Sequence, residues 1–393
     1  MQIITRLFLI LLLISPLKIL HAQDTLFHRL LGENMHLMEY SEGEFTGPAW
    51  DIITNEAKAS QNVLIGEDHF TNEIPEFVRE LAKSSGYDNF YIEVDPYTTR
   101  LLEASLNGSP AEKKEFRDKY GDILSFYTLS PEYEMLEAIH NTGAGLLGSD
   151  QIVMYDDRLL FEDLAKRTKN VSARSIYLEV AQKSKIALDT FLTNPSKPMY
   201  MITPEFQEKL SALRDLSLSD EETEVIEALA LSADIYKTQS HRKRVQLLID
   251  QLMDDYPHWK DKRNLFKYGA SHMSRAESVM NIHDIGSIVA GITMGNYQKS
   301  LHIMILGESG SQSGPFSTFP PSSVEPADSY YLNYLMPLIE MTEGDQWHVF
   351  DLRPLRRALY KKEIFPDNLN MIRAITGYDL LVLIPSVTPA GFD

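Results

Sequence analysis

Apolar segments that alternate with helical patterns constrain the fold of this chain more than any other feature. Strands that alternate with helices indicate an α/β domain with a mainly parallel sheet. Continuous apolar runs, without in-out alternation, favour strands covered on both faces. The predicted strands are residues 62–67, 89–95, 144–150, 264–272, 301–307, 347–352 and 379–385. We therefore predict an α/β fold in which helices flank a mainly parallel, mixed central sheet.

The middle of the chain departs from this pattern. Residues 155–256 contain no convincing strand, and their apolar positions recur at helical intervals. Ser219 followed by Glu222 is typical of a capping box at the start of a helix. We predict that residues 155–256 form an all-helical, lid-like insert in an α/β domain whose two halves are residues 23–154 and 257–393.

The chain opens with a segment typical of a cleaved export signal. Arg6 precedes a short apolar run, and the small residue Ala22 comes directly before Gln23. The run is shorter than the roughly 20 residues that a bilayer crossing requires, and no later segment is long enough. We predict that residues 1–22 are a signal peptide and that the exported protein, periplasmic or secreted, has no membrane span once the signal is removed.

Charge and cysteine content exclude several functional classes. The chain has 37 basic and 56 acidic side chains, and the net charge of -19 repels nucleic acids and anionic membranes. It has no cysteine, which excludes disulfides, a thiol nucleophile and a thiolate metal site. It also lacks the G-x-S-x-G elbow of serine hydrolases and a phosphate-binding loop with its lysine. The expected partner is a small-molecule substrate, and the oligomeric state stays open.

Ionisable and polar residues stand at the carboxyl ends of the predicted strands, where open α/β sheets bind ligands. One such ending is typical of helix caps and turns. Several acids and histidines brought together in a cleft perturb one another's pKa, and such clusters are enriched at active sites. We therefore expect one common cleft. The residues in question are Glu67 and His69, Glu93 and Asp95, Asp150 and Gln151, and His272 with Arg275.

Several short motifs occur in a characteristic order: "GEDHFTNEIPEFVREL", "YIEVDP", "GSDQ", "GASH", "IGSIV" and "YDLLVLIPSVTPA". In this order the chain resembles the superfamily of erythromycin esterase-like proteins, ChaN-type haem-binding lipoproteins and TraB/TIKI proteins. The similarity runs from about residue 60 to residue 390, interrupted by the helical insert. In the esterase branch it implies a water-activating site formed by Glu67, His69, Glu93 and His272.

Two departures from the esterase pattern stand out. Only Asp68 separates Glu67 from His69, whereas the esterases usually have two residues there. Gly269 occupies the position at which they tend to carry the first histidine of a late pair. Macrolide hydrolysis is therefore not implied by the resemblance.

We predict a metal-free hydrolysis in which His69 is the general base. A neutral imidazole can take a proton from water near pH 7 when a carboxylate orients it and stabilises the resulting cation. Glu67 or Glu93 would be that carboxylate. His272 or Arg275 would face the oxyanion that develops on an ester or amide carbonyl.

Four further polar residues are predicted to bind substrate: Asp95, Asp150, Arg242 and Arg275. Arg242 is included among them because members of the similar family tend to carry an arginine ahead of a similar helix. Structural interpretations stay open for two of them. Asp150 would then tie down the end of a strand, and Arg275 would form an ion pair with Glu277 or another surface acid.

A different class of function also stays open. His69, His272, Glu67 and Glu93 form a reasonable ligand set for zinc or manganese, and the ChaN branch implies a haem- or metal-binding protein without catalysis. The cofactor would then be haem or a divalent metal instead of none. In either case the insert and the Ser-, Gly- and Pro-rich loop at residues 308–328 would shape the pocket.

Overall fold

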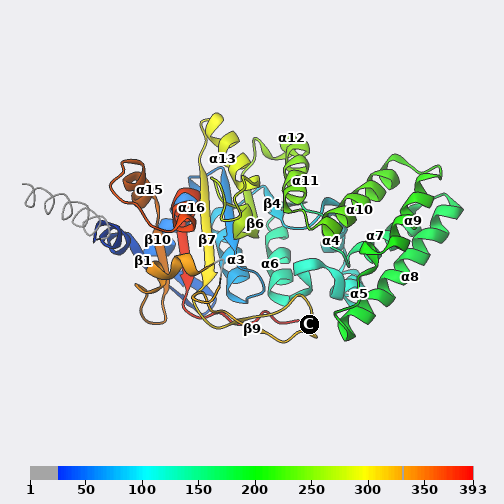
Figure 1. Ribbon diagram of the computed structural model, residues 1–393, viewed down its shortest axis with the longest axis horizontal. Helices are drawn as coiled ribbons and strands as arrows, with labels where there is room; N and C mark the ends of the chain where they lie inside the picture. The colour runs from blue at the N-terminus through cyan, green and yellow to red at the C-terminus, as the bar shows by residue number, and fades with distance from the viewer. Residues whose placement is uncertain (1–24, 330–331, 393) are drawn as a thin grey trace, which may run out of the picture. The chain divides into compact units, whose positions relative to one another are not determined.

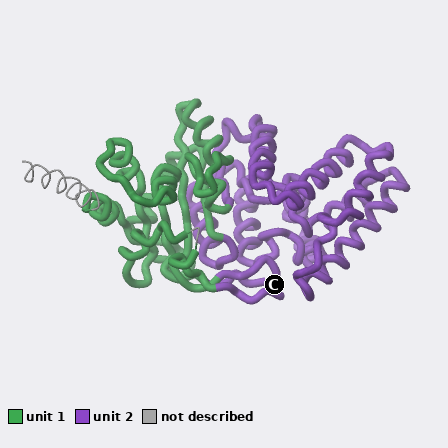
Figure 2. Tube along the Cα trace, in the orientation of Figure 1, with its two compact units in different colours: residues 1–68, 269–311, 323–387 green, residues 69–268, 312–322, 388–393 purple. Residues whose placement is uncertain are grey.

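The computed structural model describes residues 25–329 and 332–392. The predicted signal peptide, residues 1–22, lies outside these described residues. The chain forms two compact units, shown in different colours in Figure 2. Unit 1 comprises residues 1–68, 269–311 and 323–387, and unit 2 comprises residues 69–268, 312–322 and 388–393.

The strands of unit 1 follow the order β2-β1-β10-β11-β7-β3. β7 runs parallel to both β3 and β11, whereas β10 is antiparallel to β11 and to β1. Every residue of β3, β7 and β11 is buried, which accounts for their continuous apolar sequences. The strands are β1 (Met35–Ser41), β2 (Glu44–Thr46), β3 (Asn62–Glu67), β7 (Ser300–Gly307), β10 (Trp347–Asp351) and β11 (Leu380–Ile384).

Helices connect these strands (Figure 1). Residues 25–33 are helical. The others in the described part of unit 1 are α2 (Pro48–Lys58), the 3₁₀ helix η4 (Ala270–His272), α13 (Ile285–Gly295), η5 (Asn333–Leu335), α14 (Met336–Ile339), α15 (Arg353–Tyr360) and α16 (Leu369–Gly377).

In unit 2 the central strand β4 (Asn89–Ile92) pairs in parallel with β5 (Gly145–Gly148) on one side and β6 (Asn264–Gly269) on the other. Tyr91 of β4 stacks on Phe266 of β6, with ring centroids 4.7 Å apart. The helices near these strands are α3 (Glu73–Ser85), α4 (Pro96–Leu106), α5 (Pro110–Tyr120), η1 (Gly121–Ile123), η2 (Ser125–Thr128) and α6 (Ser130–His140).

Between β5 and β6 the chain is helical, and residues 149–263, all of them described, contain no strand. Ser219 and Glu222 form the predicted capping box at the start of α10. The helices are α7 (Asp157–Arg167), α8 (Val171–Thr193), η3 (Tyr200–Ile202), α9 (Pro204–Arg214), α10 (Asp220–Thr238), α11 (His241–Asp254) and α12 (Tyr256–Trp259).

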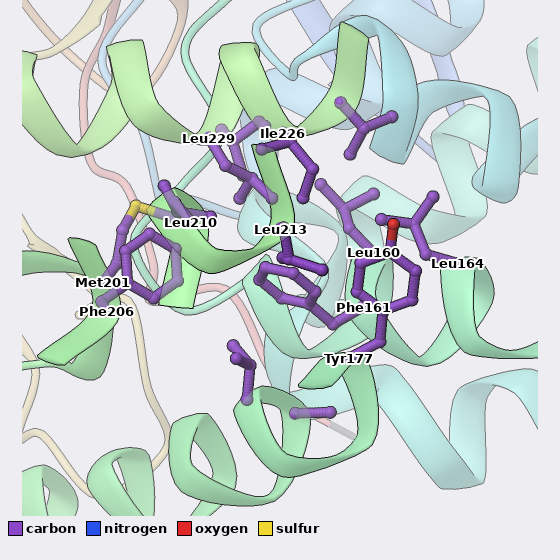
Figure 3. Packing of buried hydrophobic residues seen from close by; sticks show 14 of the residues in the cluster. Leu160, Phe161, Leu164, Tyr177, Met201, Phe206, Leu210, Leu213, Ile226 and Leu229 are labelled. Carbon is purple, nitrogen blue, oxygen red and sulfur yellow. The ribbon is translucent and has the colours of Figure 1, made fainter. Parts of the chain in front are cut away.

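These helices have a hydrophobic core of their own. Figure 3 shows side chains from α7, α8, α9 and α10 that meet in it, among them Phe161, Tyr177, Phe206 and Leu229, all of them fully buried. The core explains how a long region without strands stays folded. The boundaries predicted for the insert, residues 155–256, stay a prediction.

The predicted fold class is confirmed: an α/β fold with a mixed, mainly parallel sheet, flanking helices and a helical insertion. The sequence did not predict β1 and β2, because most of their residues are exposed or half-buried and give no continuous apolar run. The predicted strand 89–95 ends at Ile92, since Asp95 and Pro96 begin α4.

The loop at residues 308–328 contains only the short paired strands β8 (Ser311–Gln312) and β9 (Ser322–Ser323). Its part in unit 2 contacts the helical region through aromatic rings. The Phe316 ring lies 4.9 Å from that of Tyr155 and 6.3 Å from that of Phe191. These contacts hold the middle of the loop. Across residues 25–329 and 332–392, no helix combines the length and apolar character needed to cross a membrane.

Gly148, the last residue of β5, provides a test of this packing. A Cβ at this position would overlap with Oγ1 of Thr99 and the carbonyl oxygen of Val94. Gly148→Ala should therefore lower the free energy of unfolding by about 1–3 kcal/mol in urea denaturation. The control is Gly145→Ala at the other end of the strand, where a Cβ would meet its nearest atom at 3.4 Å. Equal losses in the two variants would contradict the packing.

Asp157, at the start of α7, predicts a pH dependence of stability. Burial raises the pKa of its carboxyl from 3.8 to about 7, despite hydrogen bonds from Ser184 and the backbone N–H of Arg158. The folded state therefore binds more protons than the unfolded state between about pH 4 and pH 7, and this residue's contribution to stability falls as the pH rises through that window.

Asp157→Asn should remove this contribution. The variant should gain stability over the wild type by up to about 1.4 kcal/mol per pH unit between pH 4 and pH 7. Urea denaturation at a series of pH values measures the difference. Gln182→Asn, at an exposed position of α8 that carries no titratable group, is the control and should leave the slope unaltered. A pH-independent difference for Asp157→Asn would contradict the prediction.

Candidate functional site

Glu93 and Asp95 lie between the end of β4 at Ile92 and the start of α4 at Pro96. Asp95 is the N-cap of α4: its Oδ1 accepts hydrogen bonds from the backbone N–H groups of Tyr97 and Thr98, at 3.0 and 2.9 Å. Pro96 occupies the first helical turn, where a missing N–H is harmless. Asp95 is completely buried, and burial raises the pKa of its carboxyl to about 6. Asp95 thus serves a structural role as a helix cap.

One arginine joins the ends of β4 and β5. Arg244, in the first turn of α11, donates to both carboxylate oxygens of Asp150, from Nε at 2.8 Å and from Nη2 at 2.6 Å. The same Nη2 lies 2.6 Å from Oε1 of Glu93. The Glu93 and Asp150 side chains are only 5% and 4% exposed. A single guanidinium is therefore shared by two buried carboxylates.

Asp150 and Glu93 keep the Arg244 guanidinium in its charged form. Burial acts to lower the pKa of the guanidinium, but Asp150 and Glu93 outweigh it and hold the pKa well above its ordinary value. Arg244 therefore stays protonated and keeps the Glu93 carboxylate in place.

His69 lies at the other side of Glu93. Its Nε2 is 3.6 Å from Oε2 of Glu93, and its side chain is 23% exposed. The distance exceeds that of a hydrogen bond, but opposite charges at this separation attract, so Glu93 stabilises the protonated imidazole. One face of the ring stacks on Phe126, with centroids 4.4 Å apart. A continuous chain of polar groups thus runs from Asp150 through Arg244 and Glu93 to His69.

The backbone directly after His69 is strained. Phe70 has a φ of 71°, in the left-handed region that bulky residues avoid. Such strain persists only where the surroundings fix it, and it is frequent at functional sites.

Unit 1 contains a second histidine with a carboxylate partner. Nδ1 of His272 lies 2.8 Å from Oδ2 of Asp284, and both side chains are buried. Oδ1 of Asp284 accepts from the N–H of Ile285 and so caps α13. A neutral His272 that donates from Nδ1 has its lone pair on Nε2, the arrangement of an oriented general base. Glu67, the last residue of β3, is also buried in unit 1.

Arg275 forms part of an ion cluster in unit 1. Its Nη1 lies 3.0 Å from Oδ1 of Asp379, which Arg356 also contacts at 2.6 Å. Burial acts to raise the pKa of Asp379, but Arg275, His302 and Arg356 hold it below its ordinary value. Arg275 therefore pairs with an acid 104 residues away, and the acid suggested by the sequence, Glu277, contacts Arg373 instead.

Unit 2 therefore brings together three of the predicted residues, His69, Glu93 and Asp150. Sequence reasoning missed Arg244. The predicted Arg242 is exposed two positions earlier on the same helix. The helical periodicity could have predicted that Arg244 faces inward, because it lies on the same helix face as the fully buried Leu248, four residues later.

The residues of the metal-binding alternative are divided between the two units, with His69 and Glu93 in unit 2 and Glu67 and His272 in unit 1. Across residues 25–329 and 332–392, no group of three or more His, Cys, Asp or Glu side chains is arranged to hold a metal ion. The alternative ligand set of His69, His272, Glu67 and Glu93 stays a prediction.

Comparison with known proteins places the fold. No family model matches the chain, and no curated protein matches it significantly. Among solved structures, a succinoglycan biosynthesis protein matches with a TM-score of 0.57 and 14% identity, covering 95% of this chain and 99% of its own. A Bacillus cereus protein matches with a TM-score of 0.53 and 13% identity, covering 94% and 99%.

An erythromycin esterase, EreC, carrying a His-to-Asn substitution and in its open conformation, matches with a TM-score of 0.55 and 12% identity over 91% of this chain and 98% of its own. The resemblance to erythromycin esterase-like proteins is thereby confirmed at the level of the fold. A haem-binding ChaN of Campylobacter jejuni matches with a TM-score of only 0.29, too low to support an argument.

The arginine bridge makes a stability prediction. Arg244→Ala leaves two buried carboxylates without their cation, which should lower the free energy of unfolding by about 3–5 kcal/mol. Arg242→Ala, on the exposed face of the same turn, should change it by less than about 0.5 kcal/mol. Chemical denaturation followed by circular dichroism measures both. Similar stabilities of the two variants would show that the bridge contributes nothing.

Proposed function

We propose that the protein is an exported hydrolase in which His69 removes a proton from water, so that the resulting hydroxide attacks an ester or amide carbonyl. The observation that carries the proposal is the polar chain Asp150, Arg244, Glu93 and His69 in unit 2, which ends in a solvent-accessible imidazole. Buried ionic networks are expensive unless fully compensated. In this network Arg244 bonds to both buried carboxylates, and the second oxygen of Glu93 lies 3.6 Å from His69.

In the proposed mechanism His69 begins as the neutral base. With Nε2 directed at Glu93, the tautomer protonated at Nε2 leaves Nδ1 to accept the proton from water. The imidazolium that forms is stabilised by Glu93, which Arg244 holds. When the tetrahedral intermediate collapses, the imidazolium returns a proton to the departing alcohol or amine.

The chain of charges favours the transition state over the ground state. Asp150, Arg244 and Glu93 together carry one net negative charge, and protonation of His69 places a positive charge 3.6 Å from the Glu93 carboxylate. Stabilisation that appears only as the reaction proceeds lowers the barrier. The positive charge on His69 develops in the same step as the nucleophile.

The similar fold of an erythromycin esterase supports the reaction class, although a fold by itself does not specify a substrate. The predicted assistance of His272 or Arg275 at the oxyanion stays a prediction. So does the haem- or metal-binding alternative.

Chromogenic esters and anilides of short acids test the proposal. The protein from residue 23 onward should hydrolyse at least one such ester or lactone. His69→Ala should lower kcat/KM by about 10²- to 10⁴-fold, the usual contribution of a general base. Glu93→Gln should lower it by less, because the neutral amide still occupies the place of the carboxylate.

The control is His258→Ala, since the His258 side chain is 71% exposed and lies in the same unit. It should keep the wild-type rate. Circular dichroism establishes that each variant is folded. Wild-type rates in His69→Ala, or no hydrolysis of any ester, lactone or anilide by the wild type, would reject the proposed function.

A further inference from the structure

We propose that residues 388–392, which we name the C-terminal clasp, position the imidazole of His69. The inference rests on the function proposed above, to which it adds a positioning element outside the strand-end residues. It is carried by a set of hydrogen bonds that joins the clasp to both structures that hold the His69 ring: the turn after His69 and the segment with Phe126.

The clasp is bonded to the turn through Asn72 and Glu73. The N–H of Asn72 donates to the carbonyl oxygen of Thr388 at 3.0 Å, and its Nδ2 donates to Thr388 Oγ1 and to the carbonyl oxygen of Pro389, both at 2.9 Å. The Glu73 carboxylate accepts from the N–H of Thr388 at 3.0 and 3.1 Å and from Oγ1 at 2.6 Å. Asn72 at the end of the turn and Glu73 at the start of α3 thus both bond to the clasp.

The clasp also holds the strained residue. The carbonyl oxygen of Phe70 accepts hydrogen bonds from the N–H groups of Ala390 and Ser313, both at 3.0 Å. Ser313 Oγ in turn donates to the carbonyl oxygen of Ala390 at 2.6 Å. A left-handed conformation costs a residue such as Phe about 1–2 kcal/mol, and these bonds offset that cost. Without them the backbone directly after His69 would relax.

The far end of the clasp reaches the ring that stacks on His69. The N–H of Ser130 donates to the carbonyl oxygen of Gly391 at 2.8 Å, and Phe392 forms a β-bridge with Leu129. The N–H of Leu129 donates to the carbonyl oxygen of Phe126 at 3.1 Å. One segment of five residues therefore connects the backbone under His69 with the aromatic ring beside it.

This connection matters because catalysis is more sensitive to position than stability is. A displacement of about 1 Å of a catalytic group can cost about 100-fold in rate. Loosening the clasp should therefore act on kcat, while KM and the fold change little. A purely structural role would instead appear as lost stability with normal kinetics in the folded fraction.

A series at Glu73 provides the kinetic test on the ester that the wild type hydrolyses. Glu73→Ala removes the carboxylate that accepts hydrogen bonds from the N–H and Oγ1 of Thr388. It should lower kcat about 10- to 100-fold and leave KM within twofold of the wild-type value. Glu73→Gln keeps one carbonyl oxygen and should recover part of the rate. The control is Glu80→Ala on the same helix, where Glu80 contacts Arg79 and Lys83, and it should keep the wild-type kcat.

An NMR measurement tests the clasp without relying on hydrolysis. Stacking on Phe126 should shift the His69 ring protons upfield, with the signals assigned through His69→Ala. Glu73→Ala, and a chain that ends at residue 387, should lose most of this shift, and Glu80→Ala should keep it. An unchanged shift in both clasp variants overturns the inference. If the shift is lost but the wild type hydrolyses nothing, the clasp stands and only the proposed function fails.

Discussion

Two acids buried side by side would be unstable in this protein without a cation, and Arg244 supplies it. Glu93 and Asp150 are almost fully removed from solvent, and moving carboxylates out of water costs several kcal/mol each unless they are paired and hydrogen-bonded. The guanidinium meets Asp150 with two nitrogens and Glu93 with one of the same two. This fork geometry is specific to arginine, since the ammonium of a lysine is a point charge. The other carboxylate oxygen of Glu93 lies 3.6 Å from His69. The bond to Arg244 therefore stabilises the two buried acids and also orients the Glu93 carboxylate toward the imidazole.

The scaffold around this bridge explains why the acids lie close together. β4 and β5 are parallel neighbours, so their carboxyl ends fall at the same edge and deliver Glu93 and Asp150 to one place. Gly148 allows the end of β5 to approach the backbone at Val94. Arg244 comes from α11, and helical packing around buried residues such as Leu248 fixes its position. The insertion that separates β5 from β6 is therefore part of the site.

Positioning of the imidazole depends on a different set of interactions, mostly between backbone groups. The strained turn at Phe70, the stack on Phe126 and the hydrogen bonds of residues 388–392 all converge on His69. The charge next to His69 and the position of its ring are thus controlled by different interactions. Arg244 holds the Glu93 carboxylate, and the backbone hydrogen bonds position the imidazole ring. In unit 1 one carboxylate serves both purposes, because Asp284 caps α13 and orients His272.

The sequence by itself determined the α/β class, most strands, the capping box at Ser219 and the strand-end location of His69, Glu93 and Asp150, because each depends on neighbouring residues and on the periodicity of burial. Only the tertiary structure decided the partners. Arg244, not Arg242, reaches acids 94 and 151 residues away, Arg275 pairs with Asp379, and Glu73 binds Thr388, 315 residues along the chain. Local patterns fix which face a side chain presents. Which distant group it meets depends on how the elements pack, and a single sequence carries no local signal for that.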